Sequence, residues 1–260
     1  MKSINLKPYL MAIMALCFTS LALARIPGNA PVTPDKVTDE ELYVIAKWED
    51  AALWRGDKEF SEIHYPIENG AAGCTQRGCL NGCTIGYGYN FGAHSAAKIR
   101  ADFKQAGIAN KKTEKFVPLA GVTGLDAVVM CGSQAPMRQR FPHLTQAESQ
   151  RLLRIMVLEH KRNVVGRARR ENTLKLFNSG QFSVMVALDY QNTGLSSEAT
   201  YIWRQLKRGD MDAVLDNIRH HMGTRFAPTL QWRRDWEADY FAWATSRQLA
   251  SGNYGWPPQT

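Results

Sequence analysis

The chain has 260 residues, of which 45% are hydrophobic, 22% charged and 10% aromatic. This composition predicts one globular domain with a sizeable core and excludes a disordered, collagen-like, coiled-coil or polytopic membrane protein. The formal net charge of +8 favours an anionic partner. Charge alone leaves nucleic acid, a membrane surface and an acidic cell-wall polymer open.

The N-terminus has the pattern of an export signal. Lys2 and Lys7 precede a nearly uninterrupted apolar run over 9–24, which ends in the small-x-small tripeptide at 22–24. The run has about 16 residues, fewer than the ~20 that a membrane-spanning helix needs. We therefore expect cleavage after Ala24 and no stable membrane insertion.

Export places the mature protein in the periplasm or outside the cell. The alternatives are an uncleaved membrane anchor and, with a poor match to the acylation box, a lipoprotein modified at Cys17. Because an exported protein does not meet the cell's DNA, nucleic acid is not expected as a partner despite a pI near 9.3.

The mature chain keeps an even number of cysteines, which suggests two disulfides in an oxidising compartment. Three lie within ten residues and the fourth lies further along the chain: Cys74, Cys79, Cys83 and Cys131. We expect one local bridge and one bridge to Cys131. A zinc site that uses all four is the alternative, although the spacing lacks paired C-x2-C knuckles.

Composition also predicts the domain organisation. Residues 1–24 form the signal, 25–36 carry three prolines without periodicity and form a linker, and 251–260 form a tail. Within the single domain over 37–250, glycines, cysteines and short β-type runs over 56–92 predict a hairpin or small sheet. Helical patterns fill the rest, so the fold class is α+β.

The first helix begins at a capping box made by Thr38 and Glu41. Its apolar stripe continues to a carboxylate, Glu49. After the β segment, a helix follows Ser95, and a second capping box at Thr145 opens a long helix. That long helix is expected to run to about 167, and further helices fit 181–191, 196–207, 210–221 and 229–248.

The most informative stretch is 84–92, with the sequence Thr-Ile-Gly-Tyr-Gly-Tyr-Asn-Phe-Gly. Alternating glycines let the backbone approach a ligand closely, and the side chains between them point to opposite faces of a strand. This pattern predicts a strand that borders a cleft. A plain aromatic strand edge is the alternative.

This stretch, with Gly82 and Cys83 before it, resembles the motif of phage-type lysozymes (glycoside hydrolase family 24) and of the related pesticin-like muramidases. The likeness spans about 38–245, and Asn90 stands where pesticin-like proteins usually carry Asp. Further segments resemble the family in the same order: His64-Tyr65-Pro66, the helix at 95–102, Ala-Leu-Asp-Tyr-Gln-Asn-Thr-Gly at 187–194 and Leu-Gln-Trp-Arg-Arg-Asp-Trp-Glu at 230–237.

The resemblance implies a lysozyme-like fold and a muramidase that hydrolyses the β-1,4 bond between N-acetylmuramic acid and N-acetylglucosamine in peptidoglycan. By position, Glu49 matches the general acid that protonates the leaving oxygen. A carboxyl on an apolar stripe is desolvated, which favours the protonated form. Thr84 matches the threonine that helps to place the attacking water. Glu62 and Glu68 lie closer to the motif and are the rival acids.

Asn90 departs from the family pattern, because an amide cannot accept a proton from water as Asp can. Three outcomes follow. Asn90 positions the water and activity is reduced, or Glu62 or Glu68 replaces the base, or the site binds glycan without cutting it. The last outcome defines the alternative function, a catalytically impaired lysozyme-like protein that binds glycan.

Candidate sugar contacts are Tyr87, Tyr89, Gln191 and Asn192, because aromatic faces pack on pyranose rings and amides hydrogen-bond acetamido groups. Core packing is the alternative for the tyrosines. A water-mediated path implies inversion, with the acid and the water-holding group about 6.5–9.5 Å apart. No metal or other cofactor is needed. The expected partner is the peptidoglycan glycan strand, bound by a monomer that serves as either a wall-remodelling enzyme or an antibacterial toxin.

Other charged clusters have structural interpretations. Arg233, Arg234 and Glu237 are expected to form ion pairs, and His220-His221 lacks the further ligands of a metal site. A basic run near the end of the long helix is interpreted as a solvated face or a partner of the helix dipole: Lys161, Arg162, Arg167, Arg169 and Arg170.

Overall fold

The structure is a computed structural model that describes residues 32–49, 61–65, 81–132, 135–191, 199–222 and 231–250. Two short strands, β1 (Thr84–Ile85) and β2 (Tyr89–Asn90), form a two-stranded antiparallel sheet, so the predicted α+β class is confirmed. The α-helices are α2 (Asp39–Glu49), α4 (Ala96–Gln105), α5 (Asn110–Phe116), α6 (Gly124–Cys131), α7 (Gln146–Arg170), α8 (Ser179–Gln191), α9 (Ala199–Arg208), α10 (Met211–His220) and α11 (Gln231–Ala250). Short 3-10 helices are η2 (Phe91–Ala93), η3 (Val117–Leu119), η4 (Arg138–Arg140) and η5 (Leu174–Leu176).

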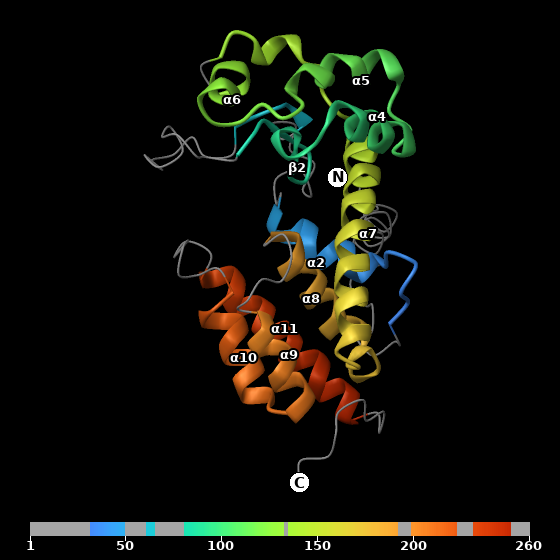
Figure 1. Cartoon of the computed structure of the whole chain (residues 1–260), viewed down its shortest axis with the longest axis vertical. Helices are drawn as coiled ribbons and strands as arrows, with labels where there is room; N and C mark the ends of the chain where they lie inside the picture. The colour runs from blue at the N-terminus through green and yellow to red at the C-terminus, as the bar shows by residue number, and fades with distance from the viewer. Residues whose placement is uncertain are drawn as a thin grey trace, which may run out of the picture.

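The buried apolar side chains form two separate clusters. The strand-side core contains residues of the hairpin, α4, α5, α6 and the start of α7. The helix-side core contains residues of α2, α8, α9, α10, α11 and most of α7. Figure 1 shows the strand-side elements at the top, the helix-side elements below, and α7 running between them. The neighbouring residues Leu152 and Leu153 of α7 belong to different cores, so α7 joins the two.

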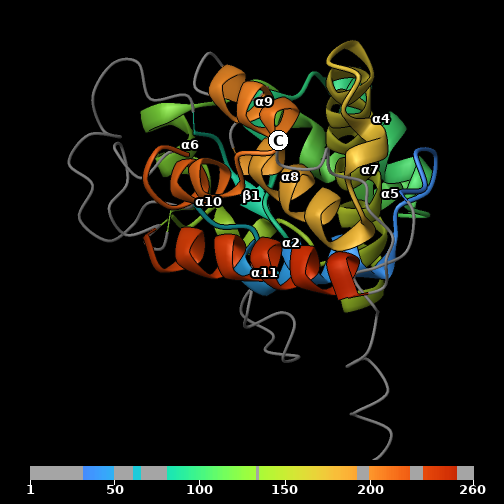
Figure 2. The ribbon, with the colours of Figure 1, turned by 90° about the horizontal axis from the view of Figure 1, so that it is seen from below.

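Helix α8 is the centre of the helix-side core. Its residues from Ser179 to Asp189 are all buried. In the view from below, α8 lies among α7, α10 and α11 (Figure 2). A helix that is buried on every side is typical of a position surrounded by other helices, and the buried polar residues of α8, such as Gln181 and Ser183, form hydrogen bonds there.

Both predicted capping boxes are confirmed. The N–H of Thr38 donates to Glu41 Oε2 at 2.8 Å, and the N–H of Glu41 donates to Thr38 Oγ1 at 3.2 Å. Thr145 and Glu148 form the same pair of hydrogen bonds at the start of α7. These bonds satisfy N–H groups that have no partner inside the helix, which fixes where α2 and α7 begin.

Two short helices, α5 and α6, were not expected from the sequence. In α5 the buried residues are Thr113 and Phe116, and in α6 they are Ala127 and Cys131. Neither helix has a side-chain cap at its N-terminus. The sequence therefore lacks the capping and periodicity signals that identified the longer helices.

One charged residue was misinterpreted from the sequence. Lys161 was expected on a solvated face, but its side chain is fully buried. Its ammonium group contacts Glu41 Oε1 at 2.5 Å and the carbonyl oxygen of Lys36 at 2.6 Å. Because a buried charge requires a partner, the pair joins the start of α2 to the middle of α7.

The expected ion pairs of α11 are confirmed and are buried. Arg233 Nε lies 2.8 Å from Glu237 Oε1, and the guanidinium of Arg234 contacts the other oxygen of the same carboxylate. Arg234 Nε also donates to the carbonyl oxygen of Met222, two residues after the end of α10. This group therefore fastens α11 to α10.

The terminal predictions lie largely outside the described residues. These are the signal at 1–24, most of the linker at 25–36 and the tail at 251–260. Within the described ranges, none of the helices combines the length and the apolar character needed to cross a bilayer.

Candidate active site

The motif at 84–92 forms a tight hairpin rather than one strand. Gly86 and Gly88 lie in the turn between β1 and β2, with φ angles of 59° and 93°. Both angles fall in the left-handed region that residues other than glycine rarely adopt. The expectation of a continuous strand over 84–92 is therefore wrong, because the glycines serve the turn.

A third segment extends the hairpin at the level of Thr84. His64 and Thr84 exchange two backbone hydrogen bonds, at 2.9 and 2.8 Å, and Thr84 also pairs with Asn90 on β2. Residues directly opposite each other in antiparallel strands project from the same face. His64, Thr84 and Asn90 thus form a row across one face, which we name the polar row.

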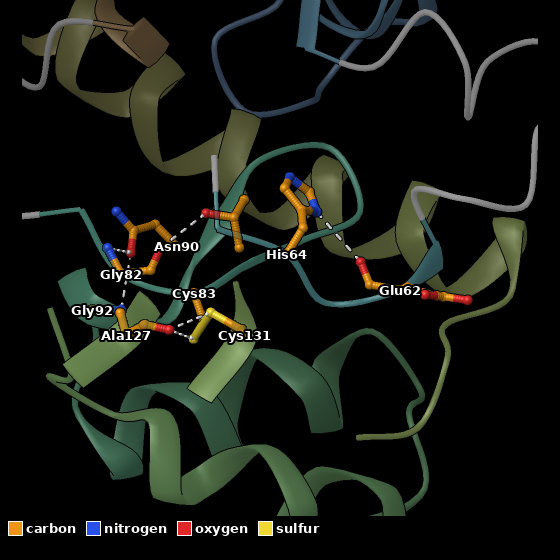
Figure 3. The surroundings of a disulfide bond; sticks show 9 residues. Glu62, His64, Gly82, Cys83, Asn90, Gly92, Ala127 and Cys131 are labelled. Carbon is orange, nitrogen blue, oxygen red and sulfur yellow. Dashed lines mark hydrogen bonds between the residues drawn. A yellow bond between two sulfur atoms is a disulfide. The ribbon is translucent and has the colours of Figure 1, made fainter. Parts of the chain in front are cut away.

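The opposite face of the same three segments is apolar. Its side chains are buried in the strand-side core: Ile63, Tyr65, Cys83, Ile85, Tyr89 and Phe91. Figure 3 shows His64 and Asn90 on one side of the strands and the Cys83–Cys131 bridge on the other. The alternation of faces along each strand thus separates the polar row from the core.

The amide oxygen of Asn90 is held by the backbone. Asn90 Oδ1 accepts from the N–H of Gly92 at 2.9 Å and from the N–H of Gly82 at 3.2 Å, as Figure 3 shows. A Cβ at position 82 would lie 2.7 Å from this oxygen, so the arrangement requires glycine there. With Oδ1 turned to the backbone, the amide group that remains on the polar row is Nδ2, a donor.

Thr84 is almost fully buried, at 6% exposure. Its hydroxyl makes a long 3.4 Å contact with the carbonyl oxygen of Gly82. A contact of this length is weak. The hydroxyl can therefore turn toward a water molecule on the polar row at little cost.

The hairpin turn docks on the helix-side core. Tyr87 is buried in that core, and its carbonyl oxygen accepts a 2.6 Å hydrogen bond from the hydroxyl of Tyr190 in α8. Gly86 lies against Ser149 of α7, where an added Cβ would be 3.2 Å from the serine side chain. The polar row consequently lies where the two cores meet.

The two tyrosines of the motif are used for packing. Tyr87 and Tyr89 are 1% and 0% exposed, and the hydroxyl of Tyr89 donates to Asp102 at 3.0 Å. Burial, with the nearby Asp102 carboxylate, raises the pKa of Tyr89 above its ordinary value. Neither ring offers a face to a sugar in this structure, so core packing replaces the expected sugar contacts.

Charged groups on α4 and α7 flank the buried ring of Tyr89. Lys98 lies 2.8 Å from Asp102 and 2.9 Å from Glu159 of α7. The ring of His94 lies 4.7 Å from that of Tyr89, and burial lowers the pKa of His94. These contacts hold the end of the hairpin against α4 and α7.

Of the three candidate acids, the structure describes the side chain of one, Glu62. Glu49 is the last residue of α2, and its side chain lies outside the described part of the chain, as does all of Glu68. Glu62 is 42% exposed and lies 3.4 Å from Arg138 and 3.6 Å from His143. Its carboxylate points away from Asn90 in Figure 3. Glu62 therefore does not join the polar row.

Of the two candidate amide contacts, Gln191 is the last residue of α8. The side-chain oxygen of Gln191 accepts a hydrogen bond from the guanidinium of Arg234, which gives Gln191 a structural role. Asn192 lies outside the described residues.

The disulfide to Cys131 is confirmed, and its partner is Cys83. The bridge joins the residue before β1 to the last residue of α6. Because their sulfurs are bonded to each other, these two cysteines do not serve as zinc ligands, and the four-cysteine alternative is wrong. Cys74 and Cys79 lie outside the described residues, so the local bridge stays a prediction.

The described residues offer no metal site. Among them, no group of three or more His, Cys, Asp or Glu side chains is arranged to hold a metal ion. His220 instead contacts Asp216, one helical turn earlier, at 2.8 Å.

His64 is the residue of the polar row that sequence reasoning did not identify as functional. The alternation of polar and apolar residues over 62–65 is a strand signal that could have placed it. Four residues were too few to be recognised as a strand that pairs with Thr84.

The sequence of the chain matches one protein family. A family model described as a domain of unknown function (DUF8812) matches residues 76–222, more than half of the chain. The chain therefore belongs to this family. The matched range includes the hairpin and α4 to α10 but not α2. A search of curated proteins found no match.

Proposed function

We propose that this member of the DUF8812 family is an exported peptidoglycan hydrolase with a lysozyme-like fold. It would cleave the β-1,4 bond between N-acetylmuramic acid and N-acetylglucosamine. The observation that carries the proposal is the polar row. Thr84 and Asn90, which match the water-placing positions of muramidases, are directly paired across one face of the hairpin where the two cores meet.

In the proposed reaction, Glu49 protonates the oxygen that leaves the sugar. A water molecule held at the polar row attacks the anomeric carbon from the opposite side, which inverts its configuration. The placement of α2 supports this role, because α2 packs in the same core as Tyr87 of the hairpin turn. Without Lys2 and Lys7, which leave with the signal, the full-chain net charge of +8 becomes +6, and this positive charge would attract the acidic wall polymer.

The test uses the oxidised mature protein, residues 25–260, on purified peptidoglycan. Wild type is compared with Glu49→Gln, and released muropeptides are identified by mass spectrometry. Reducing N-acetylmuramic acid ends from wild type, absent with Glu49→Gln, are expected. Equal cleavage by both proteins would reject Glu49 and make Glu68 the next acid to test.

The orientation of Asn90 favours a second candidate, a glycan-binding protein that does not cleave. Its side chain presents Nδ2 to the polar row, and an amide donor can hold a sugar oxygen but cannot take a proton from water. Wild type that sediments with the wall but releases no muropeptides would establish this function instead.

A further inference from the structure

We propose that one face of α7 binds a linear polymer of alcohol phosphates. This surface, which we name the basic face, carries four arginines of the helix: Arg151, Arg154, Arg162 and Arg169. The inference goes beyond the proposed cleavage, because it assigns a different ligand to a second surface of the molecule.

Helix geometry places the basic face away from the hairpin. At about 3.6 residues per turn, the arginines at positions 151, 154, 162 and 169 point into an arc of roughly 80°. All four are exposed. Ser149, which lies against Gly86 of the hairpin turn, points about 180° from the centre of that arc. A ligand on the basic face therefore leaves the polar row open.

A pocket of about 420 Å³ opens at the first half of the basic face. Its lining includes the cations Lys36, Arg151 and Arg154 together with half-buried apolar side chains of α7. Among the described residues that line it, none is acidic. Asp39, outside the lining, lies 3.2 Å from Arg154, but it is 71% exposed and solvent screens this pair. The pocket consequently keeps most of its positive charge.

A second pocket of about 420 Å³ opens where α7 ends. Arg169 and Lys175 line it, and both are exposed. In the part of the chain that the structure describes, neither side chain forms an ion pair. Glu171, the acid nearest in sequence, contacts two other cations, Arg167 and Lys207. The second pocket is therefore also positively charged and concave.

The shape and charge of the basic face favour a linear polyanion. A guanidinium group can donate two parallel hydrogen bonds to one phosphate group. From Arg151 to Arg169 the face extends about 27 Å along the helix axis. One phosphate group cannot reach both ends, whereas a chain of phosphates can. The pockets between the cations can receive the units that join the phosphates.

A membrane and a nucleic acid fit this face less well. Surfaces that bind membranes insert exposed Trp, Phe or Leu side chains, and surfaces that bind single strands stack the bases on exposed aromatic rings. Among the described residues, the exposed large apolar side chains lie on α2, α6, α9 and α11 and at Met137. None of them lines either pocket.

The test measures binding of fluorescently labelled poly(glycerol phosphate) to the mature protein by anisotropy over a range of salt concentrations. The surface variant is Lys36→Gln/Arg169→Gln/Lys175→Gln, which removes exposed cations from both pockets. We expect its affinity at low salt to fall by about tenfold or more. The slope of log K against log salt should become shallower by about 2–3, because each cation that contacts a phosphate contributes about 0.7–1.

A matched control separates a binding surface from net charge. Lys111→Gln/Lys115→Gln/Arg140→Gln removes the same charge from exposed positions outside both pockets and should bind nearly as well as wild type. An equal loss of affinity in the two variants would overturn the surface, as would a surface variant that binds like wild type.

Two further probes test the ligand. Vesicles that contain phosphatidylglycerol and a single-stranded DNA of similar charge are measured with wild type and the surface variant. If the three cations support binding to either probe but not to poly(glycerol phosphate), the proposed ligand is overturned. No cleavage is involved, so the result is independent of the test of the proposed function.

Discussion

Both cores of the molecule are built from buried apolar side chains, but they differ in the interactions added to that packing. The helix-side core contains buried ion pairs, Lys161 with Glu41 and two arginines with Glu237. The strand-side core contains a disulfide and a chain of aromatic rings, in which Phe91 and Phe116 are stacked with centroids 5.3 Å apart. Buried charges depend on exact partners, whereas ring packing depends mainly on shape and buried area.

The hairpin depends on both cores. One face of its strands packs in the strand-side core, and Tyr87 in its turn packs in the helix-side core. The polar row therefore depends on two parts of the molecule that contain different stabilising interactions. Variants that weaken one core should therefore differ from variants that weaken the other.

The largest expected loss of stability comes from breaking the buried ion pairs of the helix-side core. Glu237→Gln leaves the buried guanidiniums of Arg233 and Arg234 without their carboxylate. Removing one partner of a buried pair should lower the free energy of unfolding by about 3–5 kcal/mol. Chemical denaturation measures this change. Asp239→Asn is the matched control on the same helix, because Asp239 is 71% exposed where it meets Arg219 and should contribute less than about 1 kcal/mol.

The next effect concerns the strand-side core. The disulfide closes a loop with a sequence separation of 48. Replacing both Cys83 and Cys131 by Ser should lower the free energy of unfolding by about 2–4 kcal/mol. Hydrogen exchange should increase in α4, α5 and α6 more than in α8. Equal increases in both cores would contradict the separation between them.

A smaller effect concerns the hairpin itself. Asn90→Ala removes the acceptor of the Gly82 and Gly92 N–H groups and should cost about 1–3 kcal/mol. Asn90→Asp keeps an acceptor and should cost less. Denaturant midpoints of the two variants measure the difference. An equal loss in both would mean that these hydrogen bonds do not stabilise the hairpin.

The smallest effect is a pH dependence on the α4 side of the hairpin. Burial lowers the pKa of His94 from its ordinary value of 6.5, so the unfolded chain binds this proton more readily than the native protein. His94 therefore contributes stability above its ordinary pKa that is lost as the pH falls through the lowered value. Between about pH 7.5 and pH 5, the Tm of wild type should fall more than that of His94→Gln. An equal fall in the Tm of both proteins would contradict the lowered pKa of His94.

Much of the fold could be predicted from local signals. The capping boxes at Thr38 and Thr145 marked the starts of α2 and α7, and amphipathic periodicity marked α9 and α10. The short helix α5 lacked these signals, because it buries only Thr113 and Phe116. The burial of Lys161 was also unpredictable, since it depends on the distant Glu41.

The candidate site was predicted only in part. Local sequence marked Thr84 and Asn90, but the role of the two turn glycines depends on backbone angles that spacing does not reveal. His64 joins the row through pairing with Thr84, twenty residues later in the chain. Such pairing is a long-range contact, and no local pattern specifies it.

The most direct test of the account is the configuration of the product when it is first released. Wild-type protein is incubated with a soluble peptidoglycan fragment, and proton NMR follows the anomeric signals before they equilibrate. Attack by a water held on the polar row predicts inversion, so the β-linked substrate should give the α-anomer first. A β-anomer first would indicate a covalent intermediate on the enzyme and would contradict the account.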